Sequence, residues 1–189
     1  AVAAWAAAVP SGALLVNVAG AAIGAEPIDV ANPADWQAMY DVNVLGVVNG
    51  VNAFAPLLVE QGDEAHFVNT GSAAALRYVP SLALYSASKA AVVAFSDNLR
   101  HDLAPDGVGV SVLCPGSVDT NIGESTFSVG VGDRDPAEID AAVTALMAGV
   151  DEAHNALMAP DLVDALTLEA VRENRFYVIT HPGSVDAVA

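Results

Sequence analysis

The sequence predicts an α/β fold in which a parallel β-sheet is covered by helices on both faces. Short apolar runs bounded by turn residues alternate along the chain with longer segments of helical periodicity. Alternation at these lengths is typical of parallel strands joined by helical crossovers. The chain has 189 residues, which is enough for one domain with a real core and too few for two. We therefore expect residues 1–189 to form a single domain.

The first half of the chain predicts one strand and one long helix. The run GALLVNVAG, residues 12–20, has the pattern of a buried parallel strand, within which the polar Asn17 needs a hydrogen-bond partner. From Ala34 the sequence has helical periodicity, and Asp35 lies in the first turn, where the helix dipole favours a carboxylate. The interior of this helix contains poor helix formers and predicts a kink at Asn43.

The second half predicts three further strands. Residues 66–70 and 108–114 form short apolar runs, and the helix that contains Tyr85 lies between them and ends near Leu103. A helix over 161–174 and a strand over 175–180 close the chain. Because ligands of such sheets bind beyond the carboxyl ends of the strands, we expect Ser72, Tyr85 and Thr120 to gather at one edge.

Charge and hydropathy exclude several classes of partner. The chain carries 23 acidic residues against six basic ones, a formal net charge of −17, which repels nucleic-acid phosphates. No uninterrupted apolar run reaches the roughly 18 residues of a membrane-spanning helix, so we expect no membrane partner. The apolar start AVAAWAAAVP lacks the basic segment of a signal peptide, and we interpret it as the tail of a helix whose beginning is absent.

Cysteine and histidine usage is equally sparse. The single cysteine, Cys114, excludes an internal disulfide and favours a cytoplasmic setting. The four histidines have no ligand spacing, so we expect no metal site.

Tyr85 and Lys89 are the strongest chemical signal in the chain. They are four residues apart on a predicted helix, which places both side chains on one face, and Lys89 is the only lysine. A free tyrosine has a pKa of about 10. A neighbouring ammonium favours the phenolate, so we expect Lys89 to lower the pKa of Tyr85 toward the range of general acid–base catalysis. The alternative is a core tyrosine with an unrelated exposed lysine.

Four blocks in this order resemble the short-chain dehydrogenase/reductase family, in its compact single-domain branch. The resemblance spans essentially the whole chain and implies a Rossmann-type doubly wound parallel sheet that lacks its first βαβ segment. Its residues are the Asn-Val-Ala-Gly block of Asn17, Ala19 and Gly20, the helix asparagine Asn43, the serine thirteen residues before the Tyr-x-x-x-Lys pair, Ser72, and the segment PGSVDT with Pro115, Gly116, Val118 and Thr120. Val18 departs from the family's second asparagine.

The resemblance implies a hydride transfer between NAD or NADP and a substrate that is a secondary alcohol or a ketone. Tyr85 would be the acid–base, Lys89 would lower its pKa and hold the nicotinamide ribose, and Ser72 would donate to the substrate oxygen. Asn43 would hold a water that links Lys89 to solvent. Residues 17, 19, 20, 85, 89, 115, 116, 118 and 120 would bind the cofactor.

The family's glycine-rich turn, which cradles the dinucleotide pyrophosphate, is absent from this sequence. The residue that selects NAD or NADP is absent with it, so both cofactors stay open. We expect a strand at Leu14 without its usual neighbour, and hence an unpaired sheet edge.

Residues 121–160 fall where the family has its substrate lid. Phe127, Leu146, Met147 and Met158 would give it an apolar lining, which suggests a small hydrophobic alcohol or ketone. The helices of Asn43 and Tyr85 are the family's usual dimer faces, so the resemblance implies a homodimer or homotetramer.

Two rival hypotheses remain open. An epimerase or dehydratase of the larger branch would carry a longer C-terminal domain than the hundred residues after Lys89, and a halohydrin-lyase relative would have arginine there. The other rival is a non-enzymatic interaction protein or an inactive fragment, which the missing glycine-rich turn supports. Retention of the catalytic positions argues against it.

Overall fold

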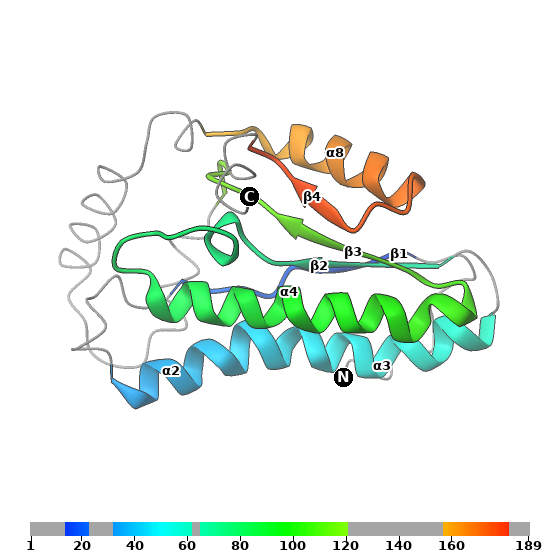
Figure 1. The fold of residues 1–189 in the computed structure, drawn as a ribbon, viewed down its shortest axis with the longest axis horizontal. Helices are drawn as coiled ribbons and strands as arrows, with labels where there is room; N and C mark the ends of the chain where they lie inside the picture. The colour runs from blue at the N-terminus through cyan, green and yellow to red at the C-terminus, as the bar shows by residue number, and fades with distance from the viewer. Residues whose placement is uncertain (1–13, 23–31, 62–64, 121–156, 182–189) are drawn as a thin grey trace.

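Four parallel strands form the sheet of this protein. The structure is a computed structural model that describes residues 14–22, 32–61, 65–120 and 157–181. The strands lie side by side in chain order (Figure 1), and they are β1 (Leu14–Asn17), β2 (His66–Thr70), β3 (Gly109–Cys114) and β4 (Tyr177–Ile179). The predicted parallel α/β fold is confirmed, and each described strand lies within or one residue from its predicted range.

Helices cover both faces of the sheet. The elements α3 (Gly46–Gln61) and α4 (Ala83–Leu103) lie along one face, while α8 (Pro160–Arg172) covers the other beside β4 (Figure 1). The chain enters α3 through α2 (Pro33–Tyr40) and a π-helical turn, η1 (Asp41–Leu45). Two short 3₁₀ turns, η2 (Ala73–Ala75) and η3 (Ala104–Asp106), precede and follow α4.

The start and the irregular middle of the α2–α3 helix have local causes. Asn32 caps α2, since its Oδ1 accepts from the backbone N–H of Ala34 at 2.7 Å, and Pro33 supplies the preset φ of a first helical residue. Asn43 lies in the π-helical turn and is fully buried. Such turns insert one residue into an α-helix, and they often mark functional sites. The sequence predicted a kink at Asn43, and the structure has the π-helical turn η1 at this position.

The main core lies between α3, α4 and the sheet. One row of α3, Val47, Val51, Phe54 and Leu58, recurs at helical spacing and packs with Phe67 of β2 and Val92 of α4. All six side chains are buried. At about 1.5–3 kcal/mol for each large apolar side chain, this row makes α3 an integral part of the domain.

By length and composition the helix from Pro33 to Glu60 could also cross a membrane, with a mean hydropathy of 1.7 over its most apolar window. Of that window 28% is buried inside the structure, and its core row contacts the sheet. A helix that covers one face of a domain has this same character, so the hydropathy does not indicate a membrane span by itself.

Strand β1 is more exposed than the sequence predicted. Leu14 and Val16 are 39% and 41% exposed, whereas β2 is almost entirely buried. Within the described residues β1 pairs with β2 alone, so its other edge has no strand beside it. The fully buried strand expected over residues 12–20 is therefore wrong for this strand, and the expected unpaired edge is present in the described part of the chain.

A buried polar cluster holds the amino ends of β2 and β3. His66 Nε2 lies 2.8 Å from Ser111 Oγ, which itself donates to the carbonyl of Arg175 at 2.6 Å. Since the Ser111 hydrogen is used in that second bond, its oxygen accepts from His66, and the ring is neutral with its hydrogen on Nε2. Burial, with a contribution from the Arg100 charge, lowers the pKa of His66 to about 4.

Replacing His66 by glutamine is expected to make the free energy of unfolding fall less steeply as the pH decreases from 7 to 5. The unfolded chain takes up a proton on His66 near pH 6.5, while the folded chain resists it down to about pH 4. This group's stabilisation is complete above pH 6.5 and is lost as the pH falls toward 4, by at most about 2 kcal/mol between pH 7 and pH 5. Urea unfolding at several pH values measures the slope. The matched control is His101→Gln, because His101 lies on the surface of α4. Equal slopes for the wild type and His66→Gln would contradict the assignment.

Candidate active site

Ser72 and Tyr85 meet at the carboxyl end of β2. Ser72 follows the strand and caps η2, where its Oγ accepts from the N–H of Ala74 at 3.1 Å. Tyr85 lies in the first turn of α4, and the Ser72 side chain is close enough to its phenol to lower the pKa of Tyr85. Ser72 is only 8% exposed. Two hydroxyl groups thus share one position where a polar ligand atom could be held between them.

Lys89 lies one turn after Tyr85 in α4 and extends into the same site. Its side chain is 2% exposed, and its Nζ donates to the carbonyl of Thr70 at 3.0 Å. The same nitrogen lies 5.9 Å from the centroid of the Tyr85 ring. The ammonium is therefore directed at the end of β2 and at the face of the ring. Burial lowers the pKa of Lys89 to about 8.

The predicted direction of the tyrosine pKa is wrong for this structure. Burial raises the pKa of Tyr85 above 10, the Ser72 side chain opposes this rise, and Cys114 adds to it. Lys89 is not among the causes. A phenolate needs solvent or a directly bonded cation, and the Lys89 ammonium is bonded to Thr70 instead. The phenol is accordingly neutral near pH 7.

Cys114 is a member of the site that the sequence argument used only to judge the redox setting. It ends β3, is fully buried, and its sulfur accepts a hydrogen bond from the backbone of Ser72. A Cβ at Gly71 would lie 3.2 Å from this sulfur, so glycine lets β2 and β3 approach closely here. Burial raises the pKa of Cys114 to about 11, and the thiol is neutral.

Asn43 connects the loop after β1 to the helix of Tyr85. Its Oδ1 accepts from the N–H of Ala21 at 2.8 Å, and its Nδ2 donates to the carbonyl of Ala21 and to Ser88 Oγ at 3.0 and 2.9 Å. Ser88 in turn donates to the carbonyl of Tyr85 at 2.7 Å. The amide of Asn43 is occupied by protein partners, so a water held here would have to bind other atoms. Ser88 was missed because a serine in a helix carries no signal of its own.

Asn17 has the buried partner that the sequence required. Its Nδ2 donates to Asn69 Oδ1 at 2.8 Å, and Asn69 donates to Ser96 Oγ of α4 at 3.0 Å. This chain of bonds joins β1, β2 and α4. A Cβ at Gly50 would overlap Asn17 Oδ1, which explains why a glycine stands inside α3.

Only the first part of the loop after β3 lies beside the site. Pro115 accepts from the N–H of Ala73 at 2.8 Å, which brings this loop beside the turn of Ser72. Gly116 N–H reaches the side chains of Thr180 and His181, both at 3.2 Å, so β4 supports the loop. The sequence predicts Thr180 at the end of the strand 175–180 and assigns neither residue a role in the site.

Val118 and Thr120 lie farther along the same loop. Val118 packs against the core under α8 and is bridged to Met158, the one described residue of the predicted lid lining. Thr120 is exposed, and no described contact brings it to Ser72 or Tyr85. Residues 121–156 of the predicted lid lie outside the described residues, and with them the other three lining residues.

A dinucleotide fits the residues that surround Lys89. A Cβ at Gly20 would lie 3.1 Å from Lys89 Nζ, so the glycine lets the loop after β1 approach the ammonium closely. Thr70 Oγ1 is buried and has no hydrogen-bond partner among the described residues, which a bound polar group would supply. Ala19 is half-buried and faces Gly46, where a Cβ would lie 3.0 Å from its own. Of the predicted binding positions in this loop, Gly20 thus lies beside Lys89 and Ala19 beside Gly46.

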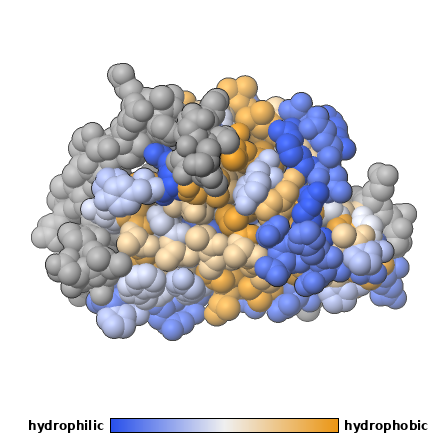
Figure 2. Space-filling model, viewed as in Figure 1, coloured by the Kyte–Doolittle hydropathy of each residue, from blue (hydrophilic) through white to orange (hydrophobic). Residues whose placement is uncertain are grey.

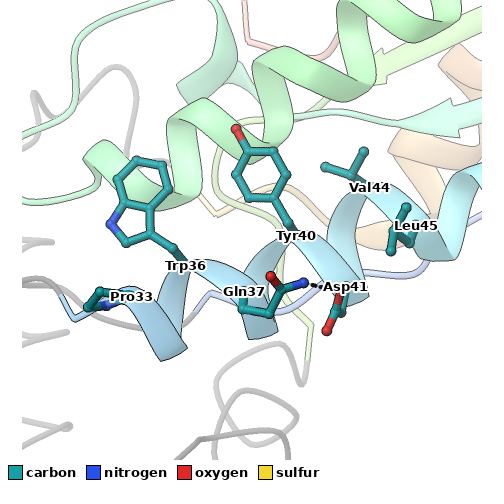
Figure 3. A pocket seen from close by; sticks show the side chains of 7 residues that line it. All are labelled: Pro33, Trp36, Gln37, Tyr40, Asp41, Val44 and Leu45. Atoms are coloured by element: carbon teal, nitrogen blue, oxygen red, sulfur yellow. Dashed lines mark hydrogen bonds between the residues drawn. The ribbon is translucent and has the colours of Figure 1, made fainter.

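A groove lies along α2 and η1. Figure 3 shows Trp36, Tyr40 and Val44 projecting from one side of the helix, with Gln37 bonded to Asp41 below them. None of the predicted site residues lines it. We therefore do not place the chemistry in this groove.

Sequence comparison identifies the relatives of this chain. The family model for short chain dehydrogenases matches residues 1–129. A sulfoacetaldehyde reductase of Chromohalobacter salexigens is 37% identical over 172 residues, which cover 91% of this chain and 59% of that protein. A probable oxidoreductase of Mycobacterium tuberculosis is 44% identical over 114 residues, 60% of this chain and 19% of that protein. The chain thus spans about six tenths of the length of the first relative.

Structure comparison agrees. A short-chain dehydrogenase/reductase of Burkholderia phymatum, solved in complex with NAD, superposes with a TM-score of 0.84 at 36% identity, covering 99% of this chain and 69% of that chain. Both comparisons span the strands and helices that carry Ser72, Tyr85 and Lys89. On its sequence and its fold, this chain belongs to the short chain dehydrogenase family.

Proposed function

We propose that this protein is an NAD(P)-dependent oxidoreductase that interconverts an alcohol and a carbonyl compound, a secondary alcohol and a ketone in the first instance. The observation that carries the proposal is the proximity of the Ser72 and Tyr85 hydroxyl groups at the sheet edge, with the buried ammonium of Lys89 at 5.9 Å from the centroid of the tyrosine ring. The family uses NAD or NADP, and its oxidoreductases support the general class of reaction. The single hydride would come from the reduced nicotinamide when that cofactor is bound.

Each side chain then has one task. In reduction, Tyr85 gives its proton to the carbonyl oxygen, and its raised pKa keeps the phenol protonated and ready for this step. Ser72 donates a hydrogen bond to the same oxygen, where negative charge develops. Lys89 places a positive charge beside Tyr85 and Thr70, and Gly20 lets the loop after β1 lie close to this charge. Asn43 holds the helix of Tyr85 in place through Ser88.

Replacing Ser72 by alanine tests the shared oxygen site. We expect kcat for carbonyl reduction to fall on the order of 100- to 1,000-fold, because one donor to the developing oxyanion is lost. The assay follows transfer of deuterium from deuterated NADH or NADPH to the carbonyl carbon. It is run on this chain and on a version extended at its N-terminus by the segment that its relatives carry. Unchanged kcat in Ser72→Ala, measured in whichever form turns over, would contradict the role.

Comparison of this chain with its extended version also distinguishes the enzyme hypothesis from that of an interaction protein. The glycine-rich dinucleotide turn is absent from this sequence, which favours the second candidate for the chain by itself. Binding of NADH or NADPH by the extended version, with turnover, would support the enzyme. Failure of both versions to bind either dinucleotide would support a binding or interaction role instead.

We propose that the protein acts as a homodimer or homotetramer in the cytoplasm. Hydrophobic surface gathers in the middle of the face shown in Figure 2. The groove of Trp36 and Tyr40 and the exposed Leu45 lie on the helices that contain or adjoin Asn43. A second copy of the chain would cover such an apolar helix face. Sedimentation of the chain and of Leu45→Glu, which should weaken a dimer through this face, tests the arrangement.

A further inference from the structure

Arg77 lies in the segment that joins the two hydroxyl groups of the site. Residues 73–84 join Ser72 to Tyr85, and Arg77 follows η2 within this segment. The segment is held in an unusual conformation, since Ser81 has a φ of 59° although it is not glycine. Arg77 lies five residues after Ser72 and eight before Tyr85 in the chain.

The Nε of Arg77 is not satisfied by any residue that the structure describes. This nitrogen is buried and has no hydrogen-bond partner among the described residues. Arg77 as a whole is half-buried, so its guanidinium is only partly in contact with solvent. An unsatisfied buried donor costs about 1–3 kcal/mol, and more when the group is charged, so natural proteins rarely keep one without a partner.

The other described cations all have partners or full exposure. Lys89 donates to Thr70, and Arg100 donates to the carbonyls of Val110 and Asn174 at 3.0 and 2.9 Å. Arg175 pairs with Glu169 and Glu173, and Arg172 is exposed at the end of α8. Arg77 has neither an ion pair nor a hydrogen bond within the described chain, although acidic residues outnumber basic ones by 23 to six.

We propose that Arg77 binds the acidic group of the substrate, and hence that the substrate is a small carbonyl compound carrying a carboxylate or a sulfonate. The inference rests on the proposed oxidoreductase function and names its substrate class, which differs from the neutral hydrophobic compound expected from the sequence. The fork of N–H groups on arginine matches two oxygens of such an anion, and the buried Nε supplies one of these donors.

The charge of the protein makes this recognition necessary. A net charge of −17 repels an anionic substrate at long range, so a dedicated cation is needed to hold one near Tyr85. The acidic group takes no part in the conversion of alcohol and carbonyl. It can therefore remain bound to Arg77 throughout, and it positions the carbonyl oxygen at the two hydroxyl groups.

The Nε–H signal of Arg77 in nitrogen-resolved NMR tests binding directly on this chain, without turnover. We expect a saturable shift of that signal on titration with isethionate or with glycolate, the two anion types, and no shift with the neutral ethylene glycol. The Nε–H signal of the exposed Arg172 is the internal control. The proposal is overturned if no anion shifts the Arg77 signal saturably, or if Arg172 responds equally. A shift caused by protein concentration alone, through a second copy, would also overturn it.

A kinetic comparison assigns the effect to the substrate. In whichever form of the protein turns over, Arg77→Gln should raise KM for the acidic ketones 2-oxopropanesulfonate or pyruvate on the order of 10- to 100-fold and leave KM for the neutral ketone butanone unchanged. Arg172→Gln, with the same loss of charge, should change neither. Equal losses on acidic and neutral ketones would overturn the proposal and leave the oxidoreductase function intact. Absence of turnover with every carbonyl compound would instead reject the oxidoreductase function, and the NMR titration would still decide whether Arg77 binds anions.

Discussion

Replacing Tyr85 by phenylalanine is expected to lower kcat for carbonyl reduction by about 100- to 10,000-fold. The substitution removes only the hydroxyl that lies near Ser72, and the ring that packs above Lys89 remains. Without that hydroxyl no proton donor lies at the shared oxygen position among the described side chains except Ser72, whose hydroxyl is far less acidic. Binding of NADH or NADPH, followed by nicotinamide fluorescence, should change little.

The segment before α4 offers a matched control. Tyr78 belongs to it and is 84% exposed, so Tyr78→Phe makes the same chemical change away from the site. We expect its kcat to equal that of the wild type. If Tyr85→Phe retained most of its activity while Ser72→Ala lost it, the proton would have to come from another group, and the assignment of Tyr85 would be wrong.

The raised pKa of Tyr85 also sets a pH dependence for the reverse reaction. Alcohol oxidation needs the phenolate as base, and burial disfavours that form. We therefore expect oxidation by the wild type to rise with pH through the alkaline range.

Lys89→Met is expected to abolish most of the activity and to make the folded chain more stable. The buried ammonium is the cation nearest the Tyr85 ring and Gly20, so its loss removes the charge that would assist proton transfer and hold a cofactor hydroxyl. We expect kcat/KM to fall by at least about 100-fold, since charged hydrogen bonds contribute roughly 1.5–3 kcal/mol each.

The gain in stability follows from the burial of the charge. The pKa of Lys89 falls from 10.5 to about 8 on folding, so the charged group destabilises the folded state at neutral pH, and this cost disappears as the pH rises from about 8 to 10.5. Methionine has a similar volume and no charge, but it leaves the carbonyl of Thr70 without its donor. Together these terms predict a net gain of about 1–2 kcal/mol at pH 7.

Thermal unfolding at pH 7 and pH 10 measures both the gain in stability and its dependence on pH. The melting temperature of Lys89→Met should exceed that of the wild type at pH 7, and the difference should shrink at pH 10. A lower melting temperature at both pH values would mean that the bond to Thr70 outweighs the cost of the buried charge. The stability argument would then be wrong, while the expected loss of activity would be judged separately.

The sequence by itself determined the parallel α/β fold and most element boundaries. These follow from local patterns: the apolar runs of β2 and β3, the periodic row from Val47 to Leu58, and the poor helix formers around Asn43. The sequence also identified Ser72, Tyr85 and Lys89 as candidate site residues, because their spacing along the chain is a property of the sequence alone.

Only the tertiary structure decided how those side chains behave. The direction of the Lys89 ammonium depends on where β2 places the carbonyl of Thr70, and the pKa of Tyr85 depends on how deeply α4 is buried. Residues such as Cys114, Ser88 and Arg77 have no local signature, since their importance comes from partners that they gain or lack across the fold. Burial and the direction of hydrogen bonds are set by contacts between segments far apart in the chain, and one-dimensional spacing does not contain them.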